Sequence, residues 1–114
     1  MSRTIVITDR AVSTEDGQFD PASIARFVVE HAGDVSVRVY VVIDMMNRAL
    51  RPLAQFADEH GFVVWSVSAT RTSRTWENEI ERILQRERSR DVIVCDTHFK
   101  SDNPRVTVHR RVTR

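Results

Sequence analysis

Short apolar runs alternate along the chain with stretches in which apolar residues recur every three or four positions. The runs are rich in β-branched residues, a pattern typical of strands, and the other stretches have the period of amphipathic helices. Strands are predicted at residues 4–8, 35–43, 62–67, 91–96 and 105–109. Helices are predicted at residues 21–32, 46–57 and 76–87. The order is therefore βαβαβαββ.

Capping and helix-breaking residues bear on three of these helix boundaries. Asp20 can cap the first helix, because its carboxylate can accept from free backbone N–H groups, and Pro21 suits the first helical position. Gly33 is placed to end that helix. Pro52 removes a hydrogen bond within the second helix, which predicts either a kink or a true start near Arg51.

Strands that alternate with helices indicate a mostly parallel sheet with helices on both faces. The strand at 35–43 is apolar at nearly every position in its second half, which is typical of a strand buried in the centre of a parallel sheet. The run at 105–109 alternates between apolar and polar residues, so we expect an antiparallel strand at one edge. The prediction is a three-layer αβα sandwich of Rossmann-like or flavodoxin-like type, in one domain over residues 1–114.

Composition narrows the class of protein. The 114 residues suit a single domain, with 41% hydrophobic and 29% charged residues. The longest apolar run, residues 39–43, is too short to cross a bilayer, and residues 1–9 lack a signal-peptide pattern. A lone cysteine, Cys95, excludes an internal disulfide and is predicted to be buried. We therefore expect a cytoplasmic protein with no membrane association.

The net charge of the chain is only +1, so it does not indicate a binding partner. The last ten residues contain four arginines and no acidic residue. Such a segment could contact phosphate or an acidic partner, or it could protect an edge strand from pairing with another sheet.

Polar residues follow each of the first four predicted strands. Asp9, Asp44 and Asp96 end three of them, and a Thr/Ser/Arg loop at 68–75 follows the other. Parallel strands end at one edge of a sheet, where α/β proteins bind ligands. The carboxylates of Asp9, Asp44 and Asp96 could therefore hold Mg²⁺ or Mn²⁺. Each Asp could equally be a helix cap or a turn former.

The loop before the third helix offers a different chemistry. Free N–H groups at a helix start attract phosphate, and arginines there would add charged hydrogen bonds. The candidate phosphate-binding residues are Thr70, Arg71, Thr72, Ser73 and Arg74. The chain contains neither a G-x-G-x-x-G nor a P-loop motif, so dinucleotide-binding and P-loop sites are not supported.

Three short segments resemble NYN/PIN-like ribonuclease domains. Residues 41–47 end in a D-x-x-N motif formed by Asp44 and Asn47, residues 76–82 are an acidic stretch on a predicted helix, and residues 92–99 place Asp96 at a strand end. The resemblance covers about residues 38–100. It implies that Asp44, Asp96 and either Glu77 or Glu81 are catalytic carboxylates that bind a divalent metal.

Two kinds of function follow. The first is a metal-dependent nuclease that uses Mg²⁺ or Mn²⁺ to cleave RNA or DNA phosphodiesters. The alternative is a non-enzymatic α/β binding module for a phosphate-bearing ligand or a protein partner, including a second copy of the chain. Strand order bears on the choice, because Asp44 and Asp96 can share a metal only if their strands are neighbours.

Overall fold

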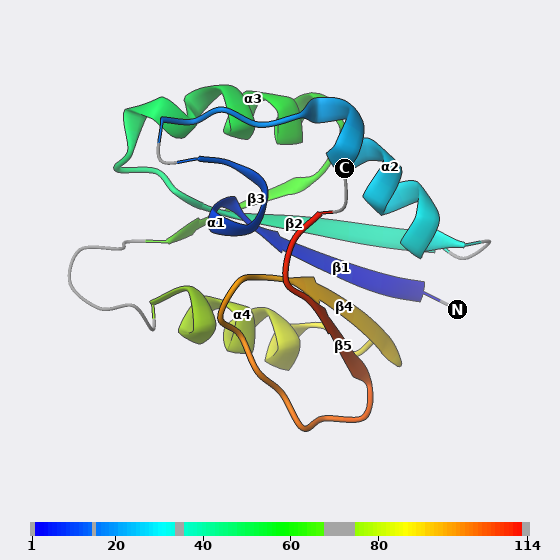
Figure 1. The fold of residues 1–114 in the computed structure, drawn as a ribbon. Coiled ribbons are helices and arrows are strands. Elements are labelled where there is room, and N and C mark those ends of the chain that lie inside the picture. Colours follow the sequence, from blue (N-terminus) through cyan, green and yellow to red (C-terminus); the bar gives the residue numbers. More distant parts are fainter. Residues whose placement is uncertain (1, 15, 34–35, 68–74, 113–114) are drawn as a thin grey trace.

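The predicted strands and helices are present in the computed structural model, which describes residues 2–14, 16–33, 36–67 and 75–112 (Figure 1). The strands are β1 (Ser2–Thr8), β2 (Ser36–Asp44), β3 (Val63–Val67), β4 (Asp91–Cys95) and β5 (Val106–His109). The helices are α1 (Asp9–Val12), α2 (Pro21–Ala32), α3 (Arg51–Glu59) and α4 (Thr75–Arg86), with a 3₁₀ turn, η1 (Arg48–Leu50), before α3. The short helix α1 was not predicted.

The capping predictions are confirmed. Asp20 is the N-cap of α2 and accepts from the backbone N–H of Ala22 at 3.1 Å, with Pro21 in the first turn. Gly33 ends α2 with a positive φ of 62°. Helix α3 begins at Arg51, so Pro52 lies in its first turn, where no hydrogen bond is lost.

The sheet has the order β3-β2-β1-β4-β5, and all its neighbouring strands are parallel. This is the order of the first five strands of a doubly wound Rossmann-like sheet. The order reverses between β1 and β4, so the ligand-binding position expected for this fold lies above the carboxyl ends of those two strands.

The predicted antiparallel edge strand is wrong, because β5 pairs with β4 in parallel. The connection at residues 96–105 returns along the sheet instead of turning back tightly. Its end pairs with the start of β4, where Val92 donates to the carbonyl of Arg105 at 2.9 Å. Extended chain of this length can span about 30 Å, nearly twice the length of β4, so no crossover helix is needed.

Two apolar cores lie on opposite faces of the sheet. On one face α2 and α3 pack against side chains such as Ile5 and Ile7 of β1, and on the other α4 packs against Val6 (Figure 1). This confirms the prediction of helices on both faces. No helix in the described part of the chain is long and apolar enough to cross a membrane.

Gly17 packs directly against the backbone of η1. A Cβ atom at Gly17 would lie 1.9 Å from the carbonyl oxygen of Ala49, and the φ of Gly17 is +81°. Gly61 has a similar φ of +72°, but a Cβ atom there would meet nothing within 4 Å. The two glycines therefore separate the cost of backbone conformation from the cost of a steric clash.

We expect Gly61→Ala to lower the free energy of unfolding by about 1–2 kcal/mol, the cost of a left-handed alanine. Gly17→Ala should cost a further ~1–3 kcal/mol, because η1 must move to make room. Urea denaturation of both variants measures the difference. Equal losses would show that the loop and η1 adjust without strain.

Candidate functional site

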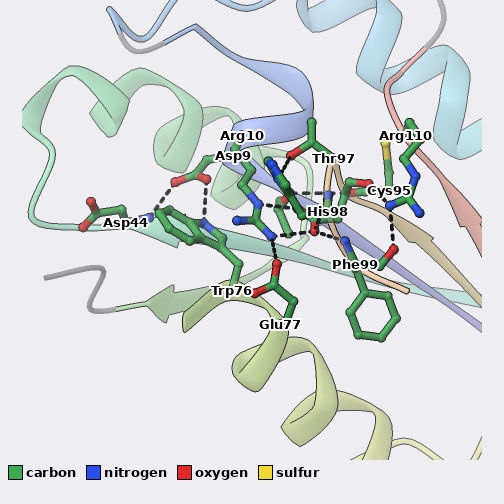
Figure 2. Close-up of polar contacts among 12 residues, drawn as sticks. Asp9, Arg10, Asp44, Trp76, Glu77, Cys95, Thr97, His98, Phe99 and Arg110 are labelled. Atoms are coloured by element: carbon green, nitrogen blue, oxygen red, sulfur yellow. Dashed lines mark hydrogen bonds and ion pairs between the residues drawn. The ribbon is translucent and has the colours of Figure 1, made fainter. Parts of the chain in front are cut away.

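Three strand-end aspartates gather at the carboxyl edge of the sheet, as predicted. Asp9 follows β1, Asp44 ends β2 and Asp96 follows β4, and the strand order places Asp9 between the other two. Figure 2 shows Asp44 on one side of Asp9, and Thr97 and His98, which follow Asp96, on the other. Because β1 separates their strands by two spacings, or about 10 Å, Asp44 and Asp96 are not placed to share one metal ion directly.

Asp96 is completely buried, and both its carboxylate oxygens accept several hydrogen bonds. Oδ1 accepts from Thr8 Oγ1 at 2.6 Å and from Arg10 Nε at 2.7 Å. Oδ2 accepts from Arg10 Nη2 at 2.7 Å and from the backbone N–H groups of His98 and Phe99 at 3.2 and 2.8 Å. Burial alone would raise the pKa of Asp96, but the bonds from Arg10 and Thr8 and the charge of Arg10 outweigh it and lower the pKa to about 2.

Arg10 contacts two carboxylates and an aromatic ring, and Figure 2 shows its side chain beside Trp76 and Glu77. Its guanidinium pairs with Asp96 and also with Glu77 in the first turn of α4. The guanidinium carbon lies 4.8 Å from the centre of the Trp76 ring, within cation–π range. Burial opposes the charge of Arg10, but its two carboxylate partners outweigh burial and raise its pKa.

Asp9 is also buried, but its side chain accepts from neutral donors. Oδ1 accepts from the Trp76 indole N–H at 2.8 Å, and Oδ2 accepts from the backbone N–H of Asp44 at 2.8 Å. Burial raises the pKa of Asp9, and the nearby Asp44 carboxylate adds to the rise, although the hydrogen bonds oppose it. Asp9 therefore ties β1 to the end of β2 and to α4.

The two residues of the D-x-x-N motif hold local backbone structure. The Oδ1 atom of Asp44 accepts from the backbone N–H of Met46 at 3.0 Å, which forms a turn. The side chain of Asn47 caps η1 by accepting from the N–H of Ala49 at 3.0 Å. The alternative interpretation of these residues as turn and cap formers thus has direct support.

Helix α4 brings one of its two candidate glutamates to the carboxyl edge of the sheet. Glu77 reaches Arg10, whereas Glu81, one turn further along α4, is exposed and lines a separate depression with Gln85 and Arg88. Glu81 is therefore not brought together with the aspartates. The predicted phosphate-binding residues Thr70 to Arg74 lie outside the described residues.

A cavity of about 410 Å³ opens above the aspartates, at the reversal of strand order. Its lining includes predicted residues and several that the site prediction missed. The lining residues are Asp9, Arg10, Ser13, Thr14, Asp44, Asn47, Leu50, Trp76, Thr97, His98 and Arg111. Arg10, Thr97 and His98 lie just after β1 and β4, so the expectation that ligands bind at the strand ends could have included them. The basic C-terminal segment, which includes Arg111, was a candidate to contact phosphate or an acidic partner, but the sequence did not place it at this edge. Trp76 begins the predicted helix at 76–87, and its pattern gave no sign of a place in the site.

Cys95 is buried within β4, as predicted. Burial, with a smaller effect of the Asp96 charge, raises the pKa of its thiol to about 12. The thiol is therefore protonated at neutral pH and is not a nucleophile at this edge.

The residues present do not fit the divalent metal that the family resemblance implies. Arg10 already occupies the space between Asp96 and Glu77, and the oxygens of Asp96 accept five hydrogen bonds. The part of the chain that the structure describes contains no group of three or more His, Cys, Asp or Glu side chains placed to hold a metal ion. No reaction step through a metal therefore follows from this geometry.

Comparisons with protein-family models, curated proteins and solved structures find no significant match to this chain. The resemblance to NYN/PIN-like domains stays a prediction that rests on the short motifs alone.

Asp96 should make folding stability depend on acid pH. Its pKa is about 2 in the folded protein and about 3.9 in an unfolded chain. The ionised carboxylate therefore stabilises the fold by roughly 2 kcal/mol above about pH 4, and this contribution is lost as the pH falls through 2.

We expect wild type to lose more stability between about pH 4 and pH 2 than Asp96→Asn does. Urea denaturation across this range measures the difference. Asp102→Asn, which removes an exposed carboxylate, is the matched control and should follow wild type. Parallel pH profiles for all three proteins would refute the role assigned to Asp96.

Proposed function

We propose that this protein is a binding module for a phosphate-bearing, nucleotide-like ligand in the cavity at the carboxyl edge of the sheet. The observation that carries the proposal is the pairing of Arg10 with Asp96 and Glu77 beneath a cavity at the reversal of strand order. Because Arg10 already neutralises charge at Asp96 and Glu77, a ligand can bind in the cavity without a metal ion. The cavity volume falls within the range of small-molecule sites.

The two sides of the cavity differ in the chemistry of their side chains. Asp44 ends β2 and Asn47 follows it at one side, and their side-chain oxygens can accept from ligand N–H or hydroxyl groups. Thr97 and His98 follow β4 at the other side, together with Arg111, which follows β5. A nucleotide has the matching asymmetry, with a phosphate at one end and hydrogen-bond donors on its base and sugar.

Arg111 is the cation best placed for the phosphate. Its side chain is exposed, and no ion pair joins it to an acidic residue within the described ranges. The other two arginines of the described C-terminal segment are occupied: Arg105 donates to carbonyls at the end of α4, and Arg110 to the carbonyls of Asp96 and Phe99. Trp76 offers a ring that a base could contact.

We expect AMP or ADP to bind in the presence of EDTA with one site per chain. Arg111→Ala should weaken binding about tenfold or more, because a hydrogen bond to a charged group contributes ~1.5–3 kcal/mol. Isothermal titration calorimetry measures both affinities. Arg86→Ala, which removes an exposed arginine at the far end of α4, is the matched control and should bind as wild type does.

Inorganic phosphate, tested separately, shows whether the phosphate alone suffices. Absence of nucleotide binding, or equal binding by wild type and Arg111→Ala, would refute the proposal. Binding that appears only with Mg²⁺ or Mn²⁺ would favour the second candidate.

The second candidate is the metal-dependent nuclease. The observation in its favour is the gathering of Asp9, Asp44, Asp96 and Glu77 around one edge of the sheet. Such an enzyme would need a metal at these carboxylates, and therefore a displaced Arg10.

The nuclease candidate predicts Mn²⁺-dependent cleavage of a labelled RNA or DNA strand that EDTA and Asp44→Asn both abolish. The binding module predicts no cleavage and only a small loss of stability for Asp44→Asn, because asparagine can keep the turn at Met46. Cleavage assays and urea denaturation of this single variant separate the two functions.

A further inference from the structure

We infer that Arg10 is a built-in counter-cation that keeps divalent metal ions out of a latent site formed by Asp96 and Glu77. This role concerns the ion at this edge and stands independently of the ligand proposed above. The arginine seated here disagrees with the metal that the family resemblance implies, and the disagreement has a geometric basis.

The geometry places one nitrogen atom where an ion would bridge the two carboxylates. Arg10 Nη2 contacts Asp96 Oδ2 at 2.7 Å and also contacts Glu77 Oε1 (Figure 2). Bonds from oxygen to hard divalent cations are about 2.0–2.6 Å. An ion at the position of Nη2 could therefore reach both carboxylates, with a contraction of a few tenths of an ångström on the Asp96 side.

The charge balance also suits a divalent ion. Arg10 brings one positive charge to two carboxylates, so the three side chains together carry one net negative charge. All three are largely or wholly buried, with side-chain exposures of 17% for Arg10, 20% for Glu77 and 0% for Asp96. A divalent cation would neutralise the same pair of carboxylates fully.

Removal of the guanidinium would free acceptor positions on both oxygens of Asp96. Nε and Nη2 of Arg10 each donate to a different oxygen of that carboxylate. Thr8 and the backbone N–H groups of His98 and Phe99 would still hold Asp96 in its present orientation. The latent site would thus keep an ordered carboxylate, which favours metal binding.

The test compares Mn²⁺ binding by wild type, Arg10→Met and Arg110→Met. Methionine keeps much of the length of the arginine side chain without its charge. Arg110 is the matched control, because it lies at the same edge but donates to backbone carbonyls and pairs with no carboxylate in the described part of the chain. The loss of the Mn²⁺ electron paramagnetic resonance signal on binding gives the affinity without any activity assay.

We expect Arg10→Met to bind Mn²⁺ at least tenfold more tightly than wild type and Arg110→Met. Saturating Mn²⁺ should raise the Tm of Arg10→Met by several degrees and leave the Tm of the other two unchanged. The double variant Arg10→Met/Asp96→Asn should lose the added binding, which assigns it to Asp96.

Two results for folded proteins would overturn the inference: no added Mn²⁺ binding by Arg10→Met, or Mn²⁺ binding by wild type that Asp96→Asn abolishes. If Arg10→Met does not fold by itself, it is refolded with Mn²⁺ or with EDTA. Recovery with Mn²⁺ alone would support the inference, and no recovery in either would overturn it. Nucleotide binding by wild type in EDTA is a separate measurement, so failure of one proposal leaves the other intact.

Discussion

The buried charge of Asp96 is the constraint around which the carboxyl edge of the sheet is organised. An ionised carboxylate with no exposed surface is costly unless a cation and hydrogen-bond donors surround it. Arg10 supplies the cation from the start of α1, and Thr8 and the loop after β4 supply further donors. Because Arg10 also pairs with Glu77, the same interaction joins β1, β4 and α4 at one point.

A second buried carboxylate, that of Asp9, extends this connection to β2. Asp9 accepts from the Asp44 backbone and from Trp76, whose ring lies near Arg10. The Trp76 ring thus contacts Arg10, and its N–H group donates to a buried carboxylate oxygen of Asp9. These contacts place a largely preformed set of polar groups at the floor of the cavity, which is the arrangement expected of a site that binds without large rearrangement.

The arginines of the C-terminal segment show why charge counts along a sequence are weak evidence for binding. Arg105 donates to the carbonyls of Leu84, Glu87 and Ser89, and it thereby satisfies groups that the end of α4 leaves without helical partners. Arg110 satisfies two carbonyls in the loop after β4. Of the three arginines described here, Arg111 alone lines the cavity beneath which Asp96 is buried.

The sequence by itself determined the α/β class, the five strands, the three longer helices and the helix start at Asp20, because these depend on local periodicity and capping. It also determined that Asp9, Asp44 and Asp96 would meet at one edge, since parallel strands all end there. Only the tertiary structure decided the direction of β5, because a long connection can return along a sheet or turn back on itself. It also decided that Arg10 neutralises Asp96: that pairing requires β1 beside β4, and sequence-distant strands become neighbours only when the sheet assembles.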